Sequence, residues 1–222
     1  MKYSAMKSED SVLVSHSPNK VTIPIKKFYM ISLRESNRFD ELISDKIKSA
    51  KNFERFYAID SRVDPLGVCK ANGYRVNLVQ YLAHFDKCAG AYGCSISHFE
   101  LYKKIAAHGG DDFFCVLEDD VRPDAESIIC KSLVSCPPCI KSLDGVNFVN
   151  LIHDHKHSSA AYLLKPSAAQ ALIDISNNTI TKPHDKFLFA ITKNCPDIKF
   201  ISIPCLHVRR RLRRDLIANK KR

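Results

Sequence analysis

The chain has 222 residues, enough for a single domain with a hydrophobic core that needs no disulfide bonds to hold it together. Hydrophobic residues make up 45% of it, as in ordinary globular proteins, and no apolar run approaches the roughly 20 residues that span a bilayer. The polar first 20 residues lack the apolar segment of a signal peptide, so we expect a cytoplasmic protein.

The formal net charge of +10 is distributed unevenly along the chain. Residues 207–222 hold eight Lys or Arg and one Asp, a charge of +7, which leaves only +3 for residues 1–206. Basic charge confined to one tail argues against a domain that binds nucleic acid over its whole surface.

The apolar patterns predict alternating strands and helices, which is typical of an α/β domain with a parallel sheet. A strand over 25–33, a helix over 39–51 and a strand over 53–59 form the opening β-α-β unit, closed by a turn at 64–67. Residues 1–24 are expected to be a flexible lead, 25–206 one domain and 207–222 a basic tail. The later elements are a helix near 78–85, a helix over 92–107, a strand over 113–117, a helix over 123–134, strands over 146–152 and 160–164, helices over 166–175 and 185–193, and a strand over 198–203.

Three consecutive carboxylates, Glu118, Asp119 and Asp120, follow the strand predicted over 113–117. Open α/β sheets bind ligands at the carboxyl ends of their strands. Alternate residues of a strand share a face, so Glu118 and Asp120 are expected to point together, with Asp119 turned away. Two carboxylates on one face repel unless a cation or proton lies between them, and their oxygens suit Mg²⁺ or Mn²⁺. A solvated acidic turn is the alternative.

Six short motifs in this order resemble glycosyltransferase family 25, which includes lipooligosaccharide and procollagen galactosyltransferases. The resemblance spans roughly residues 27–204, although Ser158-Ser159 stands where related chains usually have Gly-Thr. The motifs are Ile31-Ser32-Leu33 with Arg38; Phe56-Tyr57-Ala58-Ile59-Asp60; Gly90-x-x-Gly93-Cys94-x-x-Ser97-His98; Leu117-Glu118-Asp119-Asp120; Ala161-Tyr162-Leu163-Leu164 with Ala168-Ala169; and Pro183-His184-Asp185.

The resemblance implies a GT-A-type fold: a Rossmann-like, mostly parallel sheet flanked by helices in a single domain. It also implies inverting transfer of a hexose, commonly galactose, from a UDP-sugar to a hydroxyl of a glycan, glycolipid or protein acceptor. Mn²⁺ or Mg²⁺ held by Glu118 and Asp120 would neutralise the charge of the leaving diphosphate. His207, just past the last predicted strand, is a further candidate ligand. The alternative is a catalytically inactive relative that binds a partner through its basic tail.

The same motifs supply candidate residues for the reaction. Asp185 is the candidate catalytic base for the acceptor hydroxyl, with the neighbouring His184 as an alternative and helix capping as a purely structural role. Ser97 and His98 are expected near the nucleotide, unless His98 is a buried residue that fixes a loop. The remaining expected contacts to the donor are Ser32, Arg34, Arg38, Asp60 and Asp119, with arginine suited to phosphate by its fork of donors.

Three further features have no fixed role. The basic tail could bind an anionic membrane surface, at about 1 kcal/mol per basic residue near the lipid, or phosphates of an acceptor or nucleic acid, or nothing specific. We favour the membrane because such acceptors are often membrane-anchored. Cys136-Pro137-Pro138-Cys139 lacks the second pair of a zinc finger, so reduced structural thiols are expected. His153, His155 and His157 could bind metal or form a solvated edge.

Overall fold

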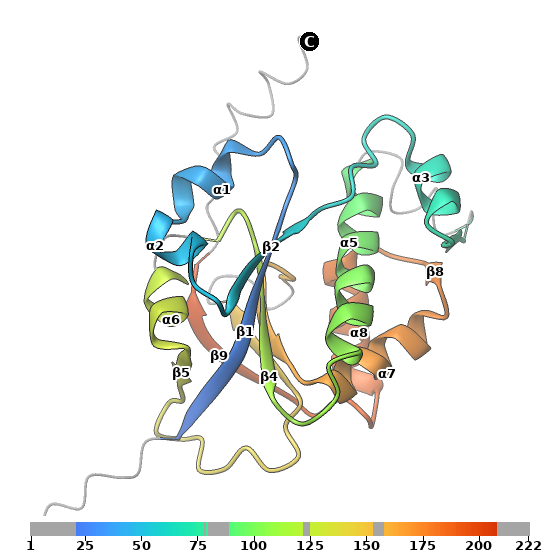
Figure 1. Cartoon of the computed structure of the whole chain (residues 1–222). Coiled ribbons are helices and arrows are strands. Elements are labelled where there is room, and N and C mark those ends of the chain that lie inside the picture. Colours follow the sequence, from blue (N-terminus) through green and yellow to red (C-terminus); the bar gives the residue numbers. More distant parts are fainter. Residues whose placement is uncertain (1–20, 78, 80–88, 122–124, 153–157, 208–222) are drawn as a thin grey trace, which may run out of the picture.

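Residues 21–77, 79, 89–121, 125–152 and 158–207 are described by a computed structural model, in which helices cover both faces of a central sheet (Figure 1). The strands are β1 (Thr22–Ser32), β2 (Phe53–Tyr57), β3 (Arg75–Val76), β4 (Phe113–Glu118), β5 (Leu133–Ser135), β6 (Phe148–Ile152), β7 (Ala161–Leu164), β8 (Thr179–Ile180) and β9 (Phe200–Leu206). The helices are α1 (Asn37–Leu42), α2 (Asp45–Lys48), α3 (Pro65–Ala71), α5 (Gly90–Ala106), α6 (Ala125–Lys131), α7 (Pro166–Ser176) and α8 (His184–Asn194).

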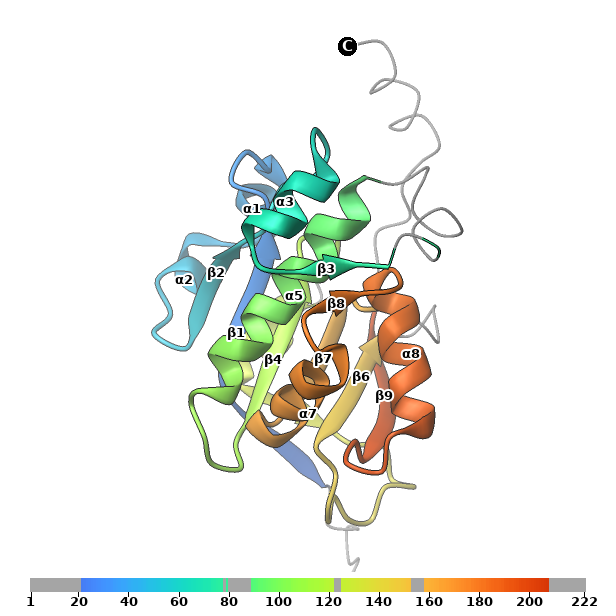
Figure 2. The same cartoon turned by 90° about the vertical axis from the view of Figure 1, so that its right-hand side faces the viewer.

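The main sheet has seven strands in the order β2-β1-β4-β7-β6-β9, with β5 paired to β1. Five of them (β1, β2, β4, β6 and β9) run in one direction, whereas β5 and β7 are antiparallel to their neighbours. The expected single, mostly parallel sheet flanked by helices is therefore confirmed. A separate two-stranded sheet, β3 with β8, lies beside α5, α7 and α8 (Figure 2).

Strand alternation divides the hydrophobic core between the two faces of the sheet. On β4, Phe113, Cys115 and Leu117 pack into the cluster that also contains residues of α1, α2 and α6. Phe114 and Val116 pack into the cluster formed with α5, α7 and α8. Burying side chains of this size contributes about 1.5–3 kcal/mol each, so both helical layers are held firmly to the sheet. The alternation also directs the next residue of β4 toward α5.

Two local predictions are wrong. The helix expected over 39–51 is interrupted, because Ile43 is extended at the end of α1 and Ser44 begins α2 as its N-cap residue. The turn expected at 64–67 is the first turn of α3, where the Asp64 carboxylate accepts a hydrogen bond from the Gly67 backbone N–H at 2.9 Å. Asp before Pro at a helix start satisfies a backbone donor that lacks a partner in the helix.

Other predicted elements agree with the structure within a few residues, but the short strands β3, β5 and β8 were not expected. Strand β1 begins at Thr22, before the predicted start of the domain. The helix expected near 78–85 (apart from residue 79), the three alternating histidines and residues 208–222 of the tail lie outside the described residues.

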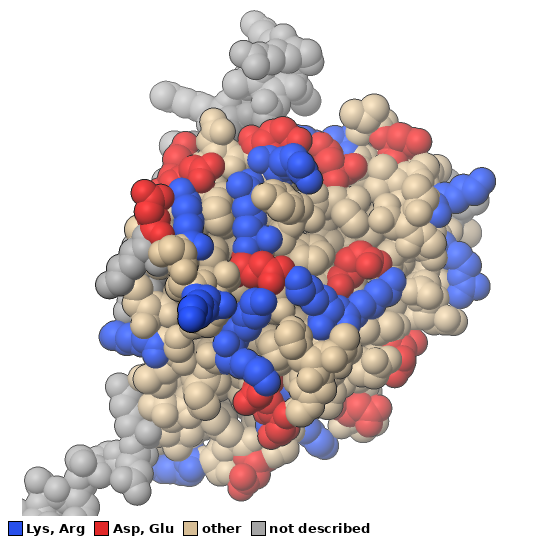
Figure 3. Space-filling view, in the orientation of Figure 1, with Lys and Arg blue, Asp and Glu red and all other residues tan. Residues whose placement is uncertain are grey.

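The eight cysteines in the described part of the chain are free thiols, with Cys136 buried and Cys139 exposed. Within the same residues, no helix is both long enough and apolar enough to cross a membrane. Acidic and basic side chains are interspersed on the face shown in Figure 3, and no continuous basic stripe crosses it.

Candidate active site

The carboxyl ends of the parallel strands meet at one edge of the sheet. In the register of the neighbouring strands, Ile31 lies beside Glu118 and Ser32 lies beside Tyr57. His207 directly follows β9, which runs in the same direction. The segments that follow β1, β2, β4 and β9 therefore leave the sheet on the same side, where α/β sheets bind ligands.

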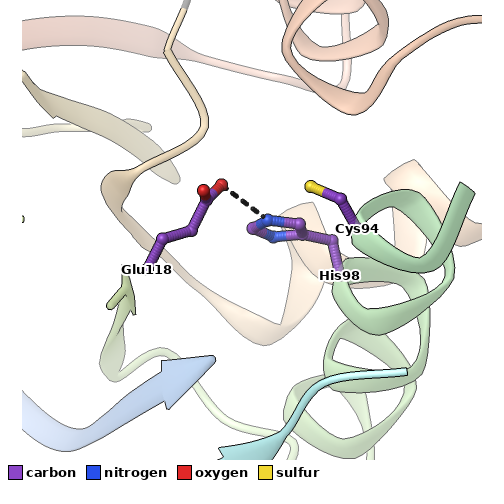
Figure 4. A group of neighbouring side chains, drawn as sticks. All are labelled: Cys94, His98 and Glu118. Carbon is purple, nitrogen blue, oxygen red and sulfur yellow. Dashed lines mark hydrogen bonds and ion pairs between the residues drawn. The ribbon is translucent and has the colours of Figure 1, made fainter. Parts of the chain in front are cut away.

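Glu118 is the last residue of β4 and points toward α5, as the alternation of that strand requires. Its Oε1 accepts a hydrogen bond from Ser159 Oγ at 2.7 Å and lies 3.1 Å from His98 Nε2. Cys94 is one helical turn before His98 on α5, and the three side chains face one another in Figure 4. Their ligand atoms all lie within 4.8 Å of one another. The first carboxylate of the triplet is thus engaged with α5.

A chain of buried polar groups continues from Glu118 to α8. His98 Nδ1 lies 2.7 Å from the Tyr162 hydroxyl, which donates to the Tyr102 oxygen at 3.0 Å, and the Tyr102 hydroxyl lies 2.8 Å from His184 Nε2. Burial raises the pKa of the Tyr102 and Tyr162 hydroxyls well above the usual value for tyrosine. Burial, with a smaller effect of His98, lowers the pKa of His184 well below its usual value. The two tyrosines and His184 are therefore neutral at pH 7.

Asp185 follows His184 in the first turn of α8 and is partly exposed. His184 itself is 2% exposed, with its Nε2 directed at Tyr102. A carboxylate at a helix N-terminus is stabilised by the unpaired backbone N–H groups there, and Asp185 Oδ1 accepts from Lys186 N at 2.8 Å. Of the two candidate bases, Asp185 is the one with access to solvent, and its catalytic role stays a prediction.

Asp119 holds the segment that follows β1. Its Oδ2 accepts hydrogen bonds from Ser32 Oγ at 2.9 Å and from Ser36 Oγ at 2.6 Å. Its backbone N–H donates to the Ile31 carbonyl at 3.2 Å, and its Oδ1 lies 3.8 Å from an Arg38 guanidinium nitrogen. These contacts fit the expectation that Asp119 orients neighbouring groups, while its contact with a donor ribose stays a prediction.

The guanidinium of Arg34 is exposed at the same edge and lies 4.8 Å from the ring centre of Tyr57, whose side chain is 53% exposed. Arg55 fixes the backbone beneath it by donating to the Leu33 carbonyl at 2.6 Å and to the Arg34 carbonyl at 3.2 Å. Its guanidinium also lies 4.3 Å from the ring centre of Phe39. Such cation–π contacts contribute roughly 0.5–1 kcal/mol each at exposed sites. Together with the hydrogen bonds of Arg55, they help to hold the segment between β1 and α1 in place.

Ser97 and Asp60 have partners within the fold. Ser97 is completely buried, accepts from Ile59 N–H at 2.8 Å and donates to the Gly93 carbonyl at 2.6 Å. A Cβ at Gly93 would lie 2.1 Å from the Ile59 oxygen, so only glycine allows this approach. Asp60 accepts from Arg62 Nε at 2.8 Å, and this contact lowers the pKa of Asp60. Direct contacts of Ser97 and Asp60 with a donor stay predictions.

The chain matches a known protein family. The sequence profile of glycosyltransferase family 25, described as an LPS biosynthesis protein, matches residues 25–137, just over half of the chain. The chain belongs to glycosyltransferase family 25. No curated protein matches it. A crystal structure of a glycosyltransferase involved in the glycosylation of the major capsid of PBCV-1 is similar over 90% of this chain and 100% of that chain, with 9% identity and a TM-score of 0.45.

The metal ligands expected in this family 25 chain do not form one cluster among the described residues. Strand β4 ends at Glu118 and residues 119–120 form a turn, so the alternation used to pair Glu118 with Asp120 does not extend that far. His207 follows β9, which is three strands along the sheet from β4. The carboxylates are nevertheless partly exposed, and their oxygens are the donors that hard cations prefer. The ligand set Glu118, Asp120 and His207 stays a prediction.

Several side chains that build the site of this family 25 protein have no role assigned from the sequence, although Tyr57, Cys94 and Tyr162 lie in its motifs. Tyr162 lies beside Val116 in the register of β4 and β7 and so faces α5, but a pairing between residues 46 positions apart is not visible in the sequence. Cys94 and His98 are four residues apart on a predicted helix, and this spacing was a usable signal. The other residues without a role assigned from the sequence are Ser36, Arg55, Tyr57, Tyr102 and Ser159.

Proposed function

We propose that this family 25 glycosyltransferase moves a hexose, with galactose as the first candidate, from a UDP-sugar to a hydroxyl of a glycan, glycolipid or protein acceptor. Family membership supports glycosyl transfer in general. The observation that carries the finer proposal is the grouping at one sheet edge of basic side chains, three partly exposed carboxylates and a further carboxylate near the start of α8. The basic groups suit the negatively charged diphosphate of a UDP-sugar, and a carboxylate suits the transfer of a proton from the acceptor hydroxyl.

The donor would lie over the segments that follow β1 and β2. Arg34 and Arg38 offer guanidinium forks for the two phosphates, which become more negative as the glycosidic bond breaks. The exposed Tyr57 ring beside Arg34 offers a flat surface against which a base or sugar ring can stack. Asp119 keeps this segment in place through Ser32 and Ser36.

Inversion requires one group that takes the proton of the attacking hydroxyl, and no covalent enzyme intermediate. Asp185 supports that role because it is partly exposed and stands next to His184. The stack of His184 on His98 places the start of α8 against the helix that carries the Glu118 contacts. The base and the donor edge are thus held by one packed unit.

A divalent cation, Mn²⁺ or Mg²⁺, would be held by Glu118 and Asp120, with His207 as a further candidate ligand. When bound, such an ion neutralises negative charge on the departing diphosphate. The oxygen donors of Glu118 and Asp120 fit these hard cations. The side chain of Glu118 is 25% exposed, so it is accessible from the edge.

We place the enzyme in the cytoplasm with its basic tail, residues 207–222, against an anionic membrane surface, as would suit a lipid-anchored acceptor. The uneven charge supports this proposal, because the tail holds eight of the 34 Lys and Arg residues. Binding of nucleic acid is less suited to a site edged with carboxylates.

The test is UDP release with Mn²⁺ over a panel of UDP-sugars, for the native chain and for Asp185→Asn, Asp120→Asn and the exposed control Asp144→Asn. Loss of a general base lowers kcat by about 10²–10⁴-fold, so Asp185→Asn should show that loss, with Asp144→Asn unchanged. A product of inverted anomeric configuration by NMR would support inversion. Turnover that is indifferent to chelator and to Asp120→Asn would exclude the metal, and sugar binding without any turnover would indicate an inactive relative.

A further inference from the structure

Cys94, His98 and Glu118 form a set of possible metal ligands. This set differs in chemistry from the oxygen ligands expected for the metal at the UDP-sugar site. We propose that these three side chains bind a divalent ion of the zinc class, so that Glu118 is shared between two mutually exclusive metal sites. The set combines a thiol, an imidazole and a carboxylate, all brought within 4.8 Å of one another (Figure 4). This inference goes beyond the proposed transfer reaction: binding of the ion does not depend on that reaction, whereas the sharing of Glu118 rests on the metal site of the proposed function.

The positions of the three side chains follow from regular secondary structure. Cys94 and His98 are four residues apart on α5, a helix of 17 residues, and therefore lie on the same face of that helix. Glu118 comes from β4 on the face of the sheet that α5 covers. No loop has to reorganise to bring the set together, since both elements are held by the same buried core.

The spacing of the nitrogen and oxygen atoms fits a small tetrahedral ion. Zinc bonds to nitrogen and oxygen are about 2.0–2.1 Å long, which places two such ligands about 3.3 Å apart at a tetrahedral angle. His98 Nε2 and Glu118 Oε1 are 3.1 Å apart. An ion could therefore replace the hydrogen bond between them with only small side-chain movements.

Outer contacts already orient two of the three ligands. His98 Nδ1 lies 2.7 Å from the Tyr162 hydroxyl, which leaves Nε2 directed at Glu118. Ser159 donates to Glu118 Oε1 at 2.7 Å. In zinc sites the second nitrogen of a ligating histidine is bonded in this way, and such outer partners change metal affinity by about 10–100-fold.

The chemistry of the set selects the ion. A thiolate with an imidazole favours Zn²⁺ over Mg²⁺ or Mn²⁺, which prefer oxygen donors. Three protein ligands leave a fourth position for water or another ligand. Access is from the edge of the sheet, because Cys94 and the side chain of Glu118 are partly exposed while His98 is completely buried. Binding would release the Cys94 thiol proton to solvent.

The experiment is titration of the full chain with Co²⁺, which takes the place of Zn²⁺ and reports a thiolate ligand by its sulfur-to-cobalt charge-transfer absorption. We expect one equivalent to bind with this absorption and Zn²⁺ to displace it. The absorption should vanish in Cys94→Ser and persist in Cys139→Ser, an exposed thiol outside the set. Tyr162→Phe should keep the absorption but weaken affinity by about 10–100-fold.

Two results would overturn the proposal. One is a native chain without the charge-transfer absorption, which would mean that no thiolate binds the metal and that His98 and Glu118 form only a hydrogen bond. The other is an absorption that survives in Cys94→Ser, which would assign it to other cysteines. Unfolding temperatures of the variants establish that each is folded. The titration needs no sugar donor, so its failure is distinct from failure of the transferase proposal.

Discussion

The imidazole rings of His98 and His184 stack face to face, with their centres 4.0 Å apart and their planes 7° apart. His98 belongs to α5 and contacts Glu118, whereas His184 begins α8 immediately before Asp185. The stack therefore joins the helix behind the carboxylates to the helix that presents the candidate base. The distance between these two parts of the site is fixed by buried side chains.

Removing the hydroxyl of Tyr102 should uncouple these helices. Tyr102→Phe leaves the Tyr162 hydroxyl and His184 Nε2 without their shared partner in a buried position, so we expect the free energy of unfolding to fall by about 1–3 kcal/mol and kcat to fall with it. Tyr74→Phe is the matched control, because its partner Glu100 remains partly exposed to water. Equal losses in the two variants by chemical denaturation would contradict the coupling.

Loss of the Arg38 guanidinium should weaken donor binding. We expect Arg38→Ala to raise KM for the UDP-sugar by about 10-fold or more, because it removes a charge-assisted hydrogen bond to phosphate. The change in kcat should be smaller, and Arg38→Lys should recover part of the loss because it keeps the charge but not the guanidinium fork. Stability should change little, since Arg38 is partly exposed and its ion pair with Asp119 is long, at 3.8 Å. Arg75→Ala on β3 is the control and should keep the native KM. An unchanged KM in Arg38→Ala would remove Arg38 from the donor site.

The sequence was sufficient for the order of strands and helices, because apolar runs such as 113–117 and 148–152 need no distant information to be recognised as buried strands. It was not sufficient where a distant partner decides the structure. Strand β5 forms because Val134 pairs with Ile23, more than 100 residues away. The reversal of β7 likewise depends on its pairing with β4.

The same limit applies to the site. The carboxylate triplet was recognised, but its division was only partly predicted. Glu118, the last residue of β4, faces α5 as alternation requires, and Asp119, in the turn that follows, contacts Ser32 and Ser36. Asp120 lies in the same turn, so strand alternation does not determine the direction of its side chain. The Ser97 hydroxyl bonds to the Gly93 carbonyl one turn back on α5 and to the Ile59 N–H, a partner that only the packing of α5 brings close; its expected place near the nucleotide stays a prediction.

Glu54 should give the protein a measurable loss of stability in acid. Partial burial acts to raise the pKa of Glu54, but hydrogen bonds from Lys104 and Lys27 outweigh it and lower the pKa. A carboxyl group with a lowered pKa stabilises the fold above its unfolded pKa of about 4.3 and loses that contribution as the pH falls through its folded value.

We therefore expect Glu54→Gln to reduce the free energy of unfolding by roughly 1 kcal/mol at pH 7, and this difference from the native chain to shrink below about pH 4.3. Urea denaturation at a series of pH values would measure it. Asp174→Asn serves as the control, because the Asp174 carboxylate on α7 accepts a hydrogen bond from the neutral Gln170 side chain at 2.8 Å. A difference that stays constant down to the acid limit would contradict the assignment.

Truncation after His207 should abolish attachment to anionic membranes. The deleted segment holds eight Lys or Arg, each contributing about 1 kcal/mol close to an anionic surface. We expect the full chain, but not the truncated chain, to sediment with phosphatidylserine vesicles, and added salt to release it. Turnover of a soluble acceptor should be equal for both chains, since His207 is retained. Failure of the full chain to sediment would exclude the membrane role.

Zinc should inhibit transfer by competing for Glu118. If Cys94, His98 and Glu118 close around Zn²⁺, Glu118 is no longer available to Mn²⁺, so added Zn²⁺ should lower the rate and excess Mn²⁺ should restore it. Cys94→Ser removes the sulfur ligand, and we expect the Zn²⁺ concentration for half inhibition to rise by at least about 10-fold, the lower limit set by loss of an outer partner alone. Each variant is compared with its own rate without zinc, and Cys139→Ser should match the native chain. Inhibition of equal strength in Cys94→Ser and the native chain would show that zinc acts elsewhere, and inhibition that Mn²⁺ cannot reverse would show that Glu118 is not shared.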